Sequence, residues 1–209
     1  MVISHQHRFV FIHVPKTGGD SITAALRPFA SPEATADGDS PDKHLTACEI
    51  RRRYIGPANW PDYFSFAFVR NPWEWLHSDY WFSVTRAAEI LRCPNQYAAR
   101  WVEKLRRVRR MTFADFVRTE WTTSPIRSYC QEAGCDIVTF IGRYENLAAD
   151  FLAICQQIGL PAAPPLPHHN ATLISGTRRY HYREDYTPHL RNLVAKRFDY
   201  EIARFDYVF

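Results

Sequence analysis

One short segment of the chain combines the residue types that bind phosphate. It follows an apolar, β-rich run over residues 9–14, precedes a helix predicted over residues 21–26, and reads Pro15-Lys16-Thr17-Gly18-Gly19-Asp20-Ser21. The first N–H groups of a helix have no partner within it, and the helix dipole favours an anion there. Lys16 adds a point charge, Thr17 and Ser21 add hydroxyl donors, and the glycines allow close backbone approach and positive φ. The segment, which we call the anion loop, therefore predicts a phosphate site.

The residue order of the anion loop differs from that of a P-loop. The pattern GxxxxGK[ST] places its lysine after the glycines, whereas Lys16 precedes Gly18 and Gly19. This difference disfavours a kinase-type site. Taken alone, the segment leaves open an ordinary strand–turn–helix with two glycines.

A second set of candidate anion ligands follows another apolar run. Residues 64–69 are predicted to form a strand, Arg70 follows it directly, and Ser78 lies about two turns into a helix predicted over residues 73–84. In open α/β sheets, ligands bind outside the carboxyl ends of the strands. A guanidinium and a hydroxyl suit a terminal phosphate, so we expect Arg70 and Ser78 to converge on one phosphate.

Both sets depend on strands whose carboxyl ends share one edge of a sheet. Apolar runs predict strands over residues 9–14, 64–69 and 137–141. Helices are predicted over residues 21–26, 73–84, 95–109, 113–120 and 147–158. Another is predicted to begin at the Thr46–Glu49 capping box, and the last begins at Thr187-Pro188. Strands alternating with helices indicate an α/β fold with a mainly parallel sheet. No internal stretch has the composition of a linker, so residues 1–209 are predicted to form a single domain.

Composition argues against several classes of protein. The chain has 209 residues, of which 46% are hydrophobic and 23% charged, as in a globular domain, and its net charge of +4 does not indicate a nucleic-acid partner. Five cysteines form an odd count without a CxxC pair, which disfavours a disulfide framework and a zinc site. No stretch has the length and hydropathy of a membrane span or a signal peptide. We therefore expect a soluble, cytoplasmic protein.

The densest basic run covers residues 104–110 on a predicted helix. A solvated helix face is one interpretation, and docking of an anionic acceptor is the other.

Taken together, the two motifs resemble the PAPS-dependent sulfotransferases, particularly the carbohydrate-modifying family 2 group (PAPS is 3'-phosphoadenosine 5'-phosphosulfate). The anion loop resembles the family's loop for the 5'-phosphosulfate, and Arg70 with Ser78, in the pattern FVRNPxxxxxS, resembles its 3'-phosphate site. Residues 140–147 and 205–209 match further family segments. The resemblance implies a P-loop-like, three-layer α/β fold with helices flanking the sheet. It also implies PAPS as sulfuryl donor without a metal, and a hydroxyl-bearing acceptor of carbohydrate type.

The resemblance implies roles for single residues. Lys16 would stabilise charge on the leaving oxygen. His44 lies just before a predicted helix, where similar family members carry a general base of near-neutral pKa, although a surface loop histidine is the alternative. Arg178 lies in a segment that resembles the family's late donor-binding loop. His168 and His169 are the next candidates for the base, and His13 is expected to be a packed residue.

Asp20 departs from the family pattern, which has Thr or Ser at this position. A carboxylate would repel a phosphosulfate, so we expect Asp20 to point away from the donor and cap the helix. Two other functions remain open at this stage. One is an ATP-dependent phosphotransferase, and the other is a catalytically inactive nucleotide- or glycan-binding module, which Asp20 makes conceivable.

Overall fold

The computed structural model describes residues 1–31, 36, 40, 42–97, 99–121, 123–167 and 181–209. The chain divides into two compact units, each built from two chain segments. The first unit comprises Met1–Arg70 and Pro125–Asn170, and the second comprises Asn71–Ser124 and Ala171–Phe209.

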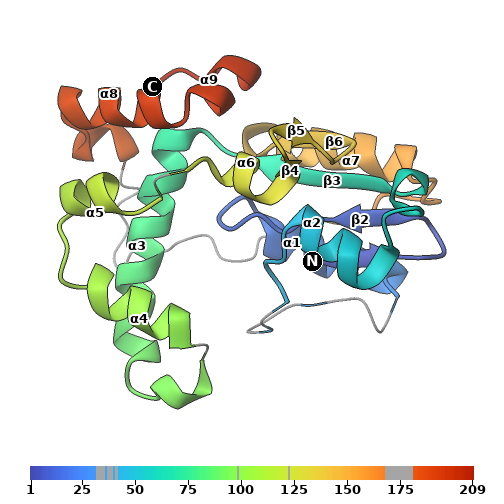
Figure 1. Cartoon of the computed structure of the whole chain (residues 1–209), viewed down its shortest axis with the longest axis horizontal. Helices are drawn as coiled ribbons and strands as arrows, with labels where there is room; N and C mark the ends of the chain where they lie inside the picture. Colours follow the sequence, from blue (N-terminus) through green and yellow to red (C-terminus); the bar gives the residue numbers. More distant parts are fainter. Residues whose placement is uncertain (32–35, 37–39, 41, 98, 122, 168–180) are drawn as a thin grey trace. The chain divides into compact units, whose positions relative to one another are not determined.

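The first unit contains a four-stranded sheet in the order β1-β2-β3-β6 (Figure 1). Its strands are β1 (Val2–Ser4), β2 (Phe9–Phe11), β3 (Phe64–Val69) and β6 (Phe140–Arg143). β2 pairs with β3 and β3 with β6 in parallel, whereas β1 pairs with β2 antiparallel. The carboxyl ends of β2, β3 and β6 therefore lie at one edge of the sheet, and the predicted α/β class with a mainly parallel sheet is confirmed.

One face of this sheet carries the main apolar core. Alternate residues of a strand share a face, and Phe9, Phe11, Phe66 and Phe68 are all fully buried. They pack with Ile22 and Leu26 of α1 (Gly19–Leu26) and with Phe151 and Ile154 of α7 (Leu147–Gln157). The sheet is thereby flanked by helices, as predicted.

The remaining elements of the first unit are short. They are η1 (Arg27–Phe29), α2 (Ala47–Ile50), η3 (Arg51–Ile55), η4 (Trp60–Asp62), α6 (Pro125–Cys130), the hairpin of β4 (Gln131–Glu132) and β5 (Cys135–Asp136), and η6 (Tyr144–Asn146). The predicted capping box is confirmed, since the Thr46 hydroxyl accepts from the Glu49 N–H while the Glu49 carboxylate accepts from Thr46 N–H.

The second unit is helical in the residues that the structure describes. It contains α3 (Pro72–Ile90), η5 (Pro94–Gln96), α4 (Ala99–Val108), α5 (Phe113–Thr119), η7 (Tyr182–Asp185), α8 (Pro188–Arg197) and α9 (Asp199–Phe205). The basic run on α4 is partly neutralised within the unit. Lys104 Nζ lies 2.7 Å from Asp79 Oδ2, and Arg107 donates to both carboxylate oxygens of Glu120.

Several sequence predictions need correction. The strand expected over residues 9–14 ends at Phe11, and the helix expected over residues 73–84 runs on to Ile90. The strand expected over residues 137–141 begins only at Phe140, because Ile137 bonds elsewhere: its N–H donates to Cys130 and its carbonyl accepts from the Trp60 indole. The helix that Thr187 caps is α8, and α9 follows it, so α8 is not the last helix.

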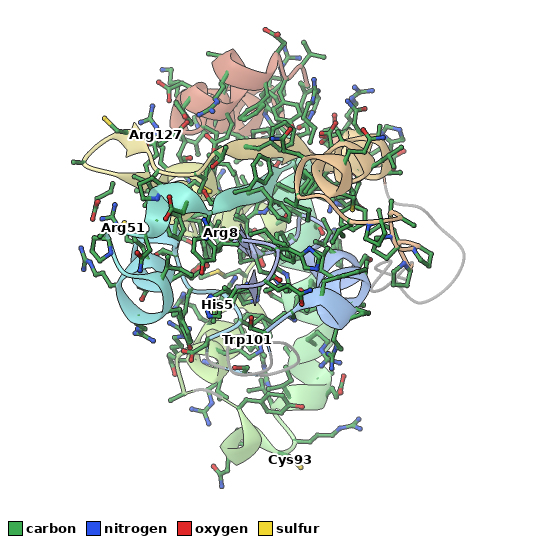
Figure 2. All side chains as sticks on the ribbon, turned by 90° about the vertical axis from the view of Figure 1, so that its right-hand side faces the viewer. His5, Arg8, Arg51, Cys93, Trp101 and Arg127 are labelled. Atoms are coloured by element: carbon green, nitrogen blue, oxygen red, sulfur yellow. The ribbon has the colours of Figure 1, made fainter. Side chains whose placement is uncertain are left out.

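All five cysteines lie in the described residues and are free thiols, with Cys93 exposed beyond the end of α3 (Figure 2). Within the same residues, each helix is too short or too polar to cross a bilayer.

Candidate functional site

Three chain segments meet at the carboxyl edge of the sheet. The anion loop follows β2, Arg70 follows β3, and Tyr144 follows β6. Arg70 Nη1 donates to the carbonyl oxygen of Lys16 at 3.2 Å, and the Arg70 guanidinium lies 4.2 Å from the centre of the Tyr144 ring. A Cβ on Gly18 would come within 3.3 Å of the Tyr144 ring. The structure thus brings the first two predicted motifs into direct contact, with Tyr144 from the third family-like segment beside them.

The backbone of the anion loop turns sharply at two residues. Lys16 has φ 65° and Gly18 has φ 80°. For a residue with a side chain, the left-handed region costs roughly 1–2 kcal/mol, so the rest of the loop must hold Lys16 in place. Gly18 is the N-cap of α1, and its carbonyl accepts from the N–H groups of Ser21 and Ile22. The N-terminus of α1 therefore adjoins the loop, which is the arrangement that an anion site requires.

Gly19 is required for a reason that the sequence did not reveal. Its backbone is helical, and a Cβ there would overlap Cδ2 and Nε2 of the His13 imidazole. His13 is only 3% exposed, so the ring has no room to retreat. Gly19 therefore leaves space for His13 rather than supplying a positive φ.

The two hydroxyls of the anion loop are buried. The Thr17 hydroxyl donates to the Val14 carbonyl at 2.9 Å, and Thr17 is 1% exposed. Thr17 would have to turn away from Val14 to donate to a phosphate. Ser21 is 6% exposed and lies in the first turn of α1. Their predicted contacts with a donor remain predictions.

His44 lies against His13, two residues before the anion loop. Its Nδ1 is 2.9 Å from the carbonyl oxygen of His13, and the two imidazole rings are 4.6 Å apart, edge to face. A carbonyl oxygen can only accept, so Nδ1 carries the proton of the neutral ring and Nε2 carries the lone pair. This geometry differs from that of a surface loop histidine.

The ionisation of His44 differs from the near-neutral expectation. Burial is the main cause that lowers the pKa of His44 to about 4, and the charges of Lys43 and the chain's amino group lower it further. The hydrogen bond to the His13 carbonyl and the charge of Asp20 act in the opposite direction and raise it. Burial likewise lowers the pKa of His13 well below its usual value. Without a bound anion, both rings are neutral at neutral pH, and His44 Nε2 can accept a proton.

Asp20 does not cap the helix, so that prediction is wrong. The left-handed Gly18 is the N-cap, which places Asp20 second in α1. The Asp20 carboxylate instead lies 2.6 Å from Lys43 Nζ and 4.0 Å from His13 Nε2. It faces the segment that carries His44. Lys43 is a site residue that sequence reasoning missed, although its position next to His44 was a signal.

Other predicted site residues are not brought to this edge by the described geometry. Ser78 lies on α3 in the second unit and is buried, whereas Arg70 belongs to the first unit, so their shared phosphate remains a prediction. Arg178, His168 and His169 lie outside the described residues.

Comparison with known proteins gives one family and two relatives of modest identity. A family model described as "Sulfotransferase family" matches residues 1–208. A protein of Archaeoglobus fulgidus named "Uncharacterized protein" is 30% identical over 126 residues, which are 56% of this chain and 84% of the relative. "Carbohydrate sulfotransferase 14" of Danio rerio is 27% identical over 193 residues, 77% of this chain and 48% of the relative, so the match spans about half of that protein. No solved structure matches.

Proposed function

Because this chain belongs to the sulfotransferase family, we propose that it moves a sulfuryl group from PAPS to an acceptor hydroxyl. The family match confirms the resemblance predicted from the two motifs. The observation that carries the proposal is the contact between those motifs, in which Arg70 donates to the carbonyl of Lys16 at the carboxyl edge of the sheet. That contact places the Arg70 guanidinium against the loop that carries Lys16 and leads into the N-terminus of α1, which suits a ligand with several anionic groups.

The residues at this edge fit the two ends of the donor. The anion loop, Pro15 to Ser21, would hold the 5'-phosphosulfate through first-turn N–H groups and Lys16. Arg70 would hold the 3'-phosphate with Ser78, and Arg178 would add a further contact. A guanidinium has five N–H donors, so Arg70 can brace the loop and bind a phosphate at the same time.

For sulfuryl transfer the protein needs to supply positioning, charge stabilisation and one proton transfer. PAPS supplies the activated sulfuryl group. His44 Nε2 accepts the proton of the acceptor hydroxyl as that oxygen bonds to sulfur. The bond from sulfur to the bridging phosphate oxygen breaks, and Lys16 stabilises the charge on that oxygen as adenosine 3',5'-bisphosphate leaves.

Donor binding should make His44 a better base. The pKa of His44, about 4 without ligand, is depressed mainly by burial. An anion close to an imidazole favours its charged form. The negative charges of the donor would therefore raise the pKa of His44 towards the near-neutral range in which a general base is most effective.

The proposed acceptor is a carbohydrate hydroxyl. The support is the name of the Danio rerio relative, together with the family-like segments of the sequence. A single domain over residues 1–209 and a cytoplasmic location are part of the same proposal and stay predictions.

Two rival functions make different demands. A phosphotransferase would need a kinase-type site for ATP with magnesium, and the position of Lys16 before the glycines disfavours such a site. An inactive binding module was conceivable because of the Asp20 charge, and the ion pair of Asp20 with Lys43 weakens that reason.

Calorimetric titration of three nucleotides tests the donor assignment. In EDTA, adenosine 3',5'-bisphosphate should bind more tightly than adenosine 5'-phosphate, and ATP, titrated separately with magnesium and without EDTA, should bind most weakly. Arg70→Gln should remove most of the advantage that the 3'-phosphate gives. The matched control is Arg8→Gln, since Arg8 precedes β2 at the opposite edge of the sheet. Equal losses for both adenosine phosphates in Arg70→Gln, or tightest binding of ATP with magnesium, would contradict the proposal.

A further inference from the structure

Three consecutive side chains, those of Asp42, Lys43 and His44, each contact another part of the first unit. Asp42 accepts from Arg53 Nη1 at 3.3 Å and from the Tyr54 hydroxyl at 3.0 Å. Lys43 pairs with Asp20 at 2.6 Å, and His44 bonds to the His13 carbonyl at 2.9 Å. The first contact ties this segment, residues 42–44, to η3, and the other two tie it to the anion-loop side of the sheet.

The Asp20–Lys43 pair lies where charge matters to an anionic ligand. Asp20 is in the first turn of α1, beside the N–H groups that suit an anion. The Lys43 side chain is 15% exposed and that of Asp20 35%. The pair is therefore part-buried, and what distinguishes it from an ordinary surface pair is its position relative to His44 and the anion loop.

We propose that Lys43 and Asp20 are positioning residues, whose ion pair fixes the His44 segment to the anion loop and cancels the charge of Asp20 beside the donor. The proposal rests on the proposed function, since it assigns the pair a role in donor binding and in placing the base. It explains how this chain carries a carboxylate at a position where the charge alone would repel a phosphosulfate.

The two halves of the pair should have opposite effects on donor binding. Lys43→Met removes the positive charge that lies 2.6 Å from the Asp20 carboxylate, so affinity for adenosine 3',5'-bisphosphate should fall. Asp20→Asn removes the negative charge and frees a cation, so affinity should hold or rise. The double variant Asp20→Asn/Lys43→Met has neither charge, and its affinity should return close to that of the wild type. A pair that acted only on folding would not produce this pattern of signs.

Turnover should follow a different pattern from affinity. In both single variants and in the double variant the His44 segment loses its ion pair with Asp20 and keeps only the bond of His44 to the His13 carbonyl on that side. A base misplaced by about 1 Å can cost up to about a hundredfold, so kcat at saturating donor should fall at least about tenfold in all three. Lys43→Arg keeps the charge and the reach, and should retain most of kcat.

Arg53→Met is the matched control. It removes a cation of the same charge from the neighbouring pair with Asp42, while the Tyr54 hydroxyl still holds Asp42 and the contact to the anion loop is untouched. Its kcat should stay within about twofold of the wild type, a much smaller change than the loss that misplacing a catalytic group causes. An equal loss in Arg53→Met would mean that any loosening of the segment suffices, which would overturn the specific role of Lys43 and Asp20.

An NMR titration of His44 separates this inference from the proposed function. The ring faces His13, Lys43, Asp20 and the amino group of Met1, so removing Lys43 should raise the His44 pKa and removing Asp20 should lower it. These shifts are measured without donor or turnover, with His44→Gln used for assignment. If the wild type fails to turn over PAPS but the shifts appear, the proposed function fails and the contact stands. Unchanged His44 titration in both variants, or unchanged kcat in an active enzyme, would overturn the inference.

Discussion

Acidification should destabilise the folded protein, and His44 should carry a measurable share of the loss. Burial lowers the pKa of His44 from 6.5 to about 4 in the folded state. Between these two values the unfolded chain binds more protons than the folded one, so the free energy of unfolding rises with pH. The stability is therefore complete above about pH 6.5 and is lost as the pH falls towards about 4.

The size of the effect follows from the same two pKa values. One pKa unit corresponds to about 1.4 kcal/mol, so a shift from 6.5 to about 4 amounts to roughly 3 kcal/mol. Since the His44 ring is not completely enclosed, this figure is an upper bound for the single residue. His13 adds to the acid sensitivity in the same direction, because burial lowers its pKa as well.

Urea unfolding at a series of pH values measures this contribution. Wild type and His44→Gln should each lose stability on acidification, but the variant should lose up to about 3 kcal/mol less between pH 6.5 and 4. His189→Gln is the control, since that side chain is exposed on α8, and it should follow the wild type. Parallel curves for wild type and His44→Gln would refute the buried, neutral imidazole on which the mechanism depends.

Three further substitutions probe the site. Lys16→Ala should lower kcat by about a hundredfold or more, with a smaller loss of affinity for adenosine 3',5'-bisphosphate, because its charge is needed most on the leaving oxygen; near-normal turnover would exclude that role. His44→Ala should lower turnover by about a hundredfold, leave nucleotide affinity nearly intact, and affect an acidic acceptor such as a nitrophenol much less. Gly19→Ala should cost roughly 1–3 kcal/mol in urea unfolding, because its Cβ overlaps the buried His13 ring. Restored stability in Gly19→Ala/His13→Ala would identify that clash as the cause, and no restoration would exclude it.

The sequence predicted the parts of the fold that depend on local signals. Residues 64–69 form β3 as expected, with residues 65–69 buried, and the Thr46 and Thr187 caps begin α2 and α8. β1 and β2 each have three residues, but only β2 lies within a longer apolar run, residues 9–14, that the sequence makes recognisable. The two-residue strands β4 and β5 are shorter still.

The candidate site was predictable where residue type determines the role. Lysine, arginine and paired glycines at strand ends indicated an anion site, and the structure brings Lys16 and Arg70 together. The partner of Asp20 could not be predicted, because Lys43 reaches it only through the path of the intervening chain. The tautomer and the lowered pKa of His44 depend on the His13 carbonyl and on burial, which only the folded structure supplies.

Transfer of label from PAPS is the most direct test of the proposed activity. The whole chain would be incubated in EDTA, and in parallel with ATP and magnesium without EDTA, with sulfur-labelled PAPS and a panel of sugars and glycans that carry free hydroxyls. His44→Ala is the matched control. We predict that the wild type forms a labelled, acid-stable sulfate ester on at least one carbohydrate together with adenosine 3',5'-bisphosphate, and that the variant forms far less. Binding of adenosine 3',5'-bisphosphate without label transfer to any acceptor, or transfer that requires ATP and magnesium, would contradict the account.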